Sequence, residues 1–516
     1  MRGALLLTVA AVVAKVLSAI YRIPFQNLVG DQGFYVFQQV YPFAAVFIVL
    51  TSSGLAVAIS KLLIDEQEYM KRQQMKKTIF SFLVLLGLLF FVVLFFGATK
   101  FGAWMGDKEL TPLIRIAAFV ALTMPFIAVL KGSYQAQNDM KRIALAQLLE
   151  QGCRVAVILG GTFIVLQMTS SIYIAGKVAI FGIVFGAVGS CLYLLLIDRK
   201  NSMSFLITPG RFFDWRIIKN VTAYSISISM SSLIVIYFQF VDAFTIFSGL
   251  QNTGLSTDVA MTMKGIYDRG QSLVQFSMVL VSALAMAIVP LVAYKSQKGE
   301  KYALPYVQLT FRVTFMLSLA AAIGLALVMP YANQMLFETD ALSGMLSVYV
   351  LQIIPLCFVL TFTAILQGYG KLLWPTLFIV LAVVVKMALN SLFIGQWGII
   401  GAAHATNIAL LLSATCFILY IKKWHAMKLA NIRYYSKLVV ATVCMIVAVS
   451  IVEWLLPTTE LDRMQAAINA FILIVVGATT FITIVAKSRV LSVREWFLLP
   501  GGKYIAALQL YLTKKK

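Results

Sequence analysis

The stretch AKVLSAIYRIPFQNLVGDQGFYVFQQVYPFAAVFIVLTSSGLAVAIS, residues 14–60, indicates how the whole chain folds. It belongs to two apolar runs, each reaching the length of about 20 residues that a membrane-spanning helix needs. Only the Gly-Asp-Gln break at residues 30–32 separates the two runs. The first run also contains Lys15 and Arg22, charges that a span rarely tolerates without a functional reason. Closely paired spans with charges inside them are therefore the first prediction.

The composition extends this prediction to the rest of the chain. Of its 516 residues, 61% are hydrophobic and 12% are charged, which leaves too little polar surface for water-soluble domains. Apolar windows predict fourteen transmembrane helices at 3–29, 33–60, 77–98, 111–135, 143–168, 172–197, 221–248, 269–294, 306–330, 344–368, 373–394, 398–421, 436–456 and 465–486. We therefore expect an all-α polytopic membrane protein without a large catalytic domain outside the membrane.

The strong positive charge is explained by membrane topology. The chain has 42 Lys and Arg against 20 Asp and Glu, a net charge of +22, which in a soluble protein would suggest nucleic acid binding. The two terminal segments and every second loop hold 30 of these cations, whereas the alternate loops hold 7. This asymmetry predicts that both termini are cytoplasmic, and it removes the argument for a nucleic acid partner.

An internal repeat predicts two lobes. SGLAVAI at residues 53–59 matches SALAMAI at 282–288, and FIAVLKG at 126–132 resembles FTAILQG at 362–368. The matching helices are six apart, so we expect two pseudo-symmetric six-helix lobes in the same orientation, as in transporters with parallel repeats. The predicted parts are the N-lobe 1–219, the C-lobe 220–430, an added helix pair 431–487 and a basic cytoplasmic tail 488–516.

Charges within the predicted spans are the candidate functional residues. Lys15 and Arg22 are seven residues apart, so they share one face of helix 1 and predict a cavity that receives an anion. Glu150 and Arg154 are four apart, the spacing of an ion pair on one helix face, and predict a structural pair. Arg154 is also a candidate contact for the anion.

A second set of charges predicts a coupling site. Asp242 is a carboxylate in the middle of helix 7, and such a group must be protonated or bind a cation. Lys386 is a base within helix 11, and Asn390 lies one turn further along the same helix. We expect Asp242 and Lys386 to approach one another, with Asp242 and Asn390 in ion coupling and Lys386 as a further anion contact.

Signatures of an enzyme are missing from the sequence. The two histidines, His404 and His425, are separated by about a full span, so they predict neither a metal site nor a catalytic triad. No Gly-rich nucleotide loop is present. We expect no catalytic residues, metal or cofactor, and a cycle driven by protons, sodium or the membrane potential.

Three segments carry a resemblance to a known family. Residues 14–30 (AKVLSAIYRIPFQNLVG), 54–62 (GLAVAISKL) and 146–155 (AQLLEQGCRV) resemble polysaccharide biosynthesis proteins of the stage V sporulation protein B type. These belong to the multidrug/oligosaccharidyl-lipid/polysaccharide exporter superfamily, as do the lipid II flippases. The resemblance extends over essentially the whole chain.

The resemblance implies a V-shaped flippase in a bacterial plasma membrane. Such a protein moves an undecaprenyl-pyrophosphate-linked sugar to the outer leaflet by alternating access, and its helices 13 and 14 form a groove for the lipid tail. Its partners are the lipid-linked sugar, membrane lipids and, as a further expectation, enzymes of cell-envelope synthesis.

The resemblance also assigns roles to single residues. Lys15 and Arg22 match the bases of helix 1 that meet the pyrophosphate. Lipid II flippases carry further arginines inside helices 2 and 8, whereas Arg269 is expected here at the end of helix 8. Asp242 and Asn390 are similar to the acid and amide of sodium-coupled relatives. The ammonium of Lys386 at that place favours coupling to protons or to the membrane potential.

Two other functions stay open on the sequence alone. A drug or cation antiporter of the same superfamily would need acids in its cavity, and the predicted spans hold more bases than acids. A membrane scaffold that recruits glycan synthases without transporting anything would have no need of charges inside its spans.

Overall fold

The computed structural model describes residues 13, 17–18, 20–169, 171–197, 214–286, 292, 300–371, 373–425, 429–456, 462–499 and 501–513. All regular secondary structure in this part of the chain is helical, which confirms the predicted all-α fold. The chain forms two compact units. The first unit is Met1–Asp268 with Asn390–Gly395, and the second is Arg269–Leu389 with Gln396–Lys516. The lobe boundaries predicted from the repeat stay a prediction.

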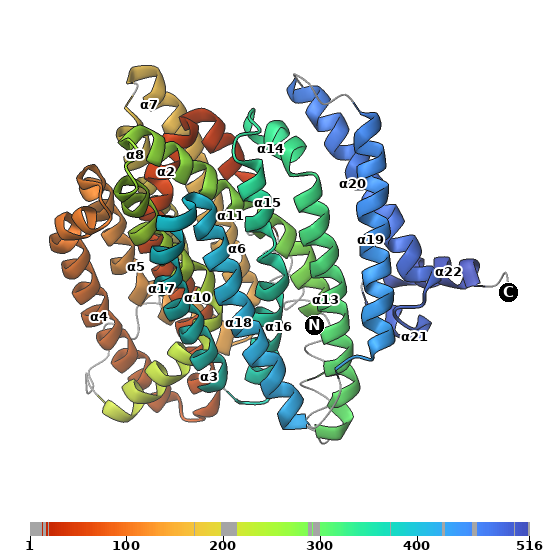
Figure 1. Ribbon diagram of the computed structural model, residues 1–516. Coiled ribbons are helices and arrows are strands. Elements are labelled where there is room, and N and C mark those ends of the chain that lie inside the picture. Colours follow the sequence, from red (N-terminus) through yellow and green to blue (C-terminus); the bar gives the residue numbers. More distant parts are fainter. Residues whose placement is uncertain are drawn as a thin grey trace. The chain divides into compact units, whose positions relative to one another are not determined.

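The first unit is a bundle of long helices (Figure 1). Its elements are α2 (Arg22–Val49), η1 (Leu50–Leu55), α3 (Ala56–Asp65), α4 (Tyr69–Trp104), η2 (Lys108–Leu110), α5 (Thr111–Ala136), α6 (Met140–Ala156), η3 (Val157–Gly161), α7 (Thr162–Met168), α8 (Ile172–Leu196), α10 (Trp215–Asn252) and the start of α11 (Thr257–Met286). Helix α5 packs against α2, α3, α4 and α8, so it lies at the centre of this unit.

The second unit contains the rest of α11 and the remaining helices. These are α13 (Glu300–Leu327), α14 (Met329–Phe337), α15 (Ser343–Val350), α16 (Ile353–Gly368), most of α17 (Leu373–Trp397), α18 (Ile399–His425), α19 (Ile432–Leu455), α20 (Arg463–Lys487), α21 (Val493–Trp496) and α22 (Gly502–Thr513). Helix α16 packs against both α13 and α18, and α19 and α20 lie side by side (Figure 1).

Twelve helical segments of the described chain are long and apolar enough to cross a membrane. One of them, Arg22–Asp65, is 44 residues long, which is about 66 Å of straight helix against about 30 Å of hydrocarbon. The predicted helices 1 and 2 meet within this segment. The total of fourteen spans stays a prediction.

A sharp kink at Gly30 divides α2 at the predicted boundary between helices 1 and 2. Gly30 has φ +69° and ψ −177°, a conformation that is essentially restricted to glycine. The amide of Gln26 donates to the Asp31 carboxylate across the kink, at 2.7 Å. Gly265 of α11 packs closely here, since a Cβ added to it would lie 2.0 Å from the Asp31 carbonyl oxygen.

Helix α11 begins earlier than the sequence predicts. We expected helix 8 to start at residue 269, but α11 starts at Thr257. Two features explain the difference. The first turns of α11 pack against the Gly30 kink, where Gln32 donates to Thr262 at 3.4 Å, and the polar pair Lys264 and Asp268 is internally neutralised. A hydropathy average counts both charges at full cost and therefore places this stretch in a loop.

Two π-helical segments interrupt the helices of the first unit. Segment η1 (Leu50–Leu55) joins α2 to α3, and η3 (Val157–Gly161) joins α6 to α7. Gly54 of η1 contacts α10 directly, because a Cβ added there would lie 1.7 Å from the Ser229 hydroxyl oxygen. Segments of this kind occur frequently at functional sites.

The buried carboxylate of Asp107 connects three elements of the first unit. Asp107 accepts hydrogen bonds from the hydroxyls of Tyr35 at 3.2 Å and Tyr173 at 2.8 Å, and from the backbone N–H of Glu109 at 3.0 Å. Burial raises the pKa of Asp107 above its usual range, although these hydrogen bonds act in the opposite direction. The contacts connect α2 and α8 to the turn after α4.

The tail folds against the second unit. We predicted that the Pro-Gly-Gly sequence at 500–502 interrupts any helix, and the described residues show Gly501 at φ +73° immediately before α22. The indole N–H of Trp496 donates to Gln509 at 2.8 Å, which joins α21 to α22, and α22 points away from α19 and α20 (Figure 1). Arg312, which we expected to extend toward the membrane surface, pairs with Glu495 of α21.

The kink predicts a specific sensitivity at Gly30. A Cβ at Gly30 meets no other atom within 4 Å, so the cost of Gly30→Ala is conformational rather than steric. We expect this variant to lose about 1–3 kcal/mol of stability, measured as a lower thermal unfolding midpoint of the detergent-purified protein. Gly152→Ala is the matched control, because Gly152 is helical and also has open space around it, so this variant should unfold like wild type. Equal midpoints for both variants would contradict the role of the kink.

Candidate functional site

Arg22 is a buried cation for which the described residues provide no hydrogen-bond acceptor. Its side chain is fully buried, and none of its three guanidinium nitrogens has a hydrogen-bond partner within the described residues. The guanidinium carbon lies 4.7 Å from the centre of the Tyr41 ring, in a cation–π contact. A cation buried in this way is costly unless an anion neutralises it.

A second group of buried charges joins α5 and α6. Glu150 accepts from Arg154 at 2.9 Å, as the four-residue spacing predicted, and Lys131 of α5 lies 3.5 Å from the other carboxylate oxygen. Lys131 also donates to the Ser52 hydroxyl in η1 at 3.2 Å. The group has two cations and one anion, and the Nε of Arg154 has no partner within the described part of the chain.

These two groups lie in the same region of the first unit. Tyr21 precedes Arg22 in the chain and interacts electrostatically with both Arg22 and Arg154. Its hydroxyl is also buried without a hydrogen-bond partner among the described residues. The surplus positive charge of the first unit is therefore concentrated around Tyr21.

Helix α11 adds a neutral ion pair. Both carboxylate oxygens of Asp268 accept from the Lys264 ammonium, at 2.6 and 2.7 Å, and both side chains are buried. Arg22 and Asp242 also interact electrostatically with Asp268. This pair therefore belongs to the same set of buried charges as the helix 1 arginine.

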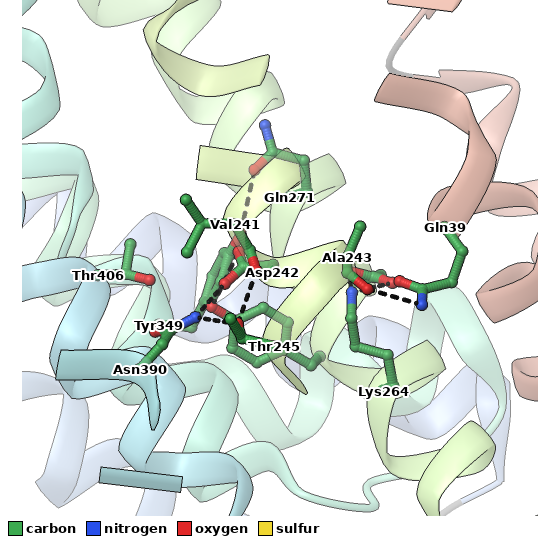
Figure 2. A network of polar contacts seen from close by, with 12 residues as sticks. Gln39, Val241, Asp242, Ala243, Thr245, Lys264, Gln271, Tyr349, Asn390 and Thr406 are labelled. Atoms are coloured by element: carbon green, nitrogen blue, oxygen red, sulfur yellow. Dashed lines mark hydrogen bonds and ion pairs between the residues drawn. The ribbon is translucent and has the colours of Figure 1, made fainter. Parts of the chain in front are cut away.

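The coupling candidate Asp242 has polar partners on both sides (Figure 2). The amide of Asn390 donates to the Asp242 carboxylate at 3.0 Å and contacts the Thr245 hydroxyl at 2.9 Å. The hydroxyl of Tyr267 donates to the other carboxylate oxygen at 3.4 Å. The side-chain oxygen of Asn390 is buried and has no partner within the described residues. Asp242 and Asn390, paired in the sequence hypothesis, thus lie together in the first unit.

The second unit holds two further buried cations. Lys386 donates to the Thr406 hydroxyl at 2.7 Å, and its predicted approach to Asp242 stays a prediction. Arg269 donates to Asn333 at 2.9 Å and lies over the Phe337 ring at 5.0 Å. We expected Arg269 at the end of its helix, which is wrong: α11 begins twelve residues before it and buries the side chain.

Sequence reasoning missed three members of this set. Lys264 was assigned to a loop, and Lys131 and Arg269 were placed near helix ends and counted as topological charges, but all three are buried within helices. The four-residue spacing of Lys264 and Asp268 was a usable signal of a helical pair. Nothing in the local sequence identifies Lys131 as the partner of Glu150. Lys15 lies outside the described residues, so its role stays a prediction.

The balance of buried charge favours an anionic ligand. Among the described residues, seven Lys or Arg side chains and four Asp or Glu side chains are buried. Two of the four acids, Glu150 and Asp268, already neutralise cations. In the part of the chain that the structure describes, no three His, Cys, Asp or Glu side chains form a metal-binding group. The expectation of no cofactor stays a prediction.

Comparison with known proteins gives a consistent result over the length of the chain. Residues 1–295 match the family described as polysaccharide biosynthesis protein. The uncharacterized membrane protein YabM of Bacillus subtilis is 31% identical over 512 residues, covering 98% of this chain and 96% of YabM. The lipid II flippase MurJ of the same organism is 25% identical, covering 93% and 94% of the two chains.

A solved structure extends the likeness to the fold. The inward closed conformation of lipid II flippase MurJ matches with a TM-score of 0.66 at 15% identity, covering 92% of this chain and 98% of that one. Together with the apolar helices, the relatives indicate a multi-pass protein of the bacterial plasma membrane. They also agree with the expectation that the chain is not an enzyme, because the relative whose name states an activity is a flippase. The chain belongs to the polysaccharide biosynthesis protein family, as its resemblance in three segments predicted.

Proposed function

We propose that this protein is a flippase that moves a lipid-linked sugar, attached through pyrophosphate, from the inner to the outer leaflet by alternating access. The observation that carries the proposal is Arg22, a fully buried guanidinium without an acceptor among the described residues. The relationship to a lipid II flippase supports the class of substrate.

Arginine is suited to this substrate. Its planar guanidinium can donate two parallel hydrogen bonds to a phosphate group, and these charge-assisted bonds are strong in a dry environment. The cation–π contact with Tyr41 holds one side of the group and leaves its N–H donors available. Arg154 adds a free Nε donor in the same region. We infer that these two arginines, together with Lys15, receive the pyrophosphate.

The second unit also contains buried cations that are suited to contact an anion. Arg269 is buried within α11, and by the resemblance lipid II flippases carry an arginine inside the corresponding helix 8. Lys386 is fully buried within α17. We propose both as anion contacts of the second unit. Helices α19 and α20 are proposed to hold the lipid tail.

A multidrug or cation antiporter is the second candidate, and Asp242 is the observation that favours it. Asp242 is a buried carboxylate that accepts hydrogen bonds from the amide of Asn390 and the hydroxyl of Tyr267. A cation exporter needs more than one such acid, and the excess of buried bases argues against it. A scaffold without transport, the third candidate, would gain nothing from an unpaired buried Arg22.

We propose that Asp242 couples the cycle to protons or to the membrane potential. Its carboxylate is buried and accepts hydrogen bonds from Asn390 and Tyr267, which belong to two other helices. By the resemblance, a base at the position of Lys386 in helix 11 favours protons or the membrane potential over sodium. No other cofactor is required.

The charge asymmetry of the loops supports a cytoplasmic location for both termini. In this orientation the basic tail faces the anionic inner leaflet and the enzymes that make lipid-linked sugars. Such enzymes are proposed as partners.

Replacing Arg22 tests the substrate site. In vesicles of anionic lipid, wild-type protein should move a fluorescent undecaprenyl-pyrophosphate sugar to the opposite leaflet. Arg22→Ala should reduce the rate about ten- to hundredfold, since it removes charge-assisted hydrogen bonds to phosphate. Lys141→Ala is the matched control, because Lys141 is exposed and should not matter. Export of a cationic dye with no movement of the sugar lipid would establish the antiporter instead, and movement of neither would favour the scaffold.

Replacing Asp242 tests the coupling. Asp242→Asn keeps the size of the side chain and its contact with Asn390 but removes the titrating group, so the transport rate should fall and lose its dependence on pH. Exchange of sodium for choline should leave the wild-type rate unchanged. A pH-dependent Asp242→Asn variant, or a wild type that stops without sodium, would contradict the proposal.

The orientation is tested with fusions at each terminus. Green fluorescent protein folds in the cytoplasm but not after export through the general secretion route, so fusions to either end should fluoresce in cells. A dark C-terminal fusion of normal abundance would show that the tail is outside.

A further inference from the structure

Glu150 is shared unequally between two cations of the first unit. Its contact with Arg154 is 2.9 Å, a normal charge-assisted distance, whereas its contact with Lys131 is 3.5 Å. The side chains of Lys131 and Arg154 are both almost fully buried, and so is Glu150. Arg154 is therefore the main partner of Glu150 in this structure, and Lys131 is close enough to replace it.

The group has one positive charge more than it can neutralise. An uncompensated charge in an apolar interior is costly, so the group attracts an anion. The Nε of Arg154 has no partner within the described residues, and Tyr21, which precedes Arg22 in the chain, interacts electrostatically with both arginines. An anion bound by Arg22 thus competes with Glu150 for Arg154.

We propose that Lys131 is a positioning residue for anion binding through a partner exchange. When the pyrophosphate group proposed above binds to Arg22 and Arg154, Arg154 turns from Glu150 to the anion. Lys131 then closes on Glu150 and neutralises it. Lys131 never touches the anion, but it removes the cost of leaving a carboxylate buried and unpaired. The inference rests on the proposed function, since it needs an anion at Arg22.

The backbone around the group restricts the exchange to side chains. A Cβ added to Gly186 of α8 would lie 2.6 Å from the Glu150 carbonyl oxygen, and one added to Gly132 would lie 2.8 Å from Ile59 of α3. Both glycines therefore lie where two helices pack closely, so there is little space for a larger residue beside the group. Lys131 also donates to the Ser52 hydroxyl in the π-helical segment η1. When the Lys131 ammonium moves toward Glu150, it gives up this hydrogen bond, and the change occurs next to an irregular helical segment.

The exchange predicts a non-additive pair of substitutions. In Lys131→Met, binding of an anion leaves Glu150 unpaired, so the affinity for inorganic pyrophosphate should fall about tenfold or more. In Glu150→Gln, Arg154 is already free, so the affinity should be equal to wild type or tighter. In the double variant, the carboxylate that needed Lys131 is gone, and the affinity should return to that of Glu150→Gln.

The measurement is calorimetric titration of the full-length protein in lipid nanodiscs with inorganic pyrophosphate, repeated with farnesyl pyrophosphate. Thermal unfolding confirms that each variant is folded, and Lys141→Met, an exposed lysine, is the matched control. Lys131→Arg keeps the charge and should bind like wild type, which provides a test if Lys131→Met does not fold. If the variants rank in the predicted order of affinity with both probes, the exchange responds to the pyrophosphate group itself. If they rank in this order only with farnesyl pyrophosphate, the exchange requires a lipid-linked pyrophosphate.

Three results would overturn the inference. Wild-type affinity in Lys131→Met would show that Glu150 needs no second cation. Equal weakening in Lys131→Met and in the double variant would mean that Lys131 contacts the anion itself or only supports the fold. A wild-type protein that binds neither probe would remove the anion site of the proposed function as well, whereas the first two results leave that function intact.

Discussion

The first unit depends on the rule that a charge in an apolar interior must be neutralised close by. Glu150 pairs with cations of two helices, Lys131 of α5 and Arg154 of α6, and it is the only acid in contact with either cation within the described residues. The ion pair connects α5 to α6, and the Ser52 contact extends it to the π-helical segment that ends helix 2. Packing at the centre of this unit is thus decided by charge as well as by apolar contact.

Local spacing predicted the features that arise within one helix. The Glu150–Arg154 pair follows from its four-residue separation, and the break at Gly30 follows from the loss of apolar character between two runs. Asn390 lies against Asp242 although 148 positions separate them; the two were grouped because each is a polar residue within a predicted span, and the family resemblance agreed. Contacts between distant helices depend on packing, which a single sequence does not specify.

The errors have one physical cause. A hydropathy average treats each charge as if it were alone in the membrane, whereas a charge that meets a partner costs far less. Lys264 and Asp268 neutralise one another, and the early turns of α11 also bind the kink at Gly30, so the helix starts at Thr257 and brings Arg269 into its interior. Assigning these residues to a loop or to a helix end removed them from the set of functional candidates. Lys264 and Arg269 were thus counted as topological charges although both are buried.

Arg22 differs from Lys131, Arg154 and Lys264 because no carboxylate in the described part of the chain forms an ion pair with it. Lys131, Arg154 and Lys264 have Glu150 or Asp268, whereas Arg22 has the face of Tyr41, which stabilises a cation without neutralising it. A protein that needed Arg22 only for stability would be served as well by an apolar residue of similar volume, since buried charges add little net stability even when paired. An arginine with free donors is useful when an anion arrives and departs.

The same reasoning applies to the shared Glu150: a carboxylate with two partners of unequal distance can release one of them and remain neutralised, which a simple pair cannot do. Reversible binding of an anion in an apolar interior requires both properties, a donor that is free and a neighbour that can be released at low cost.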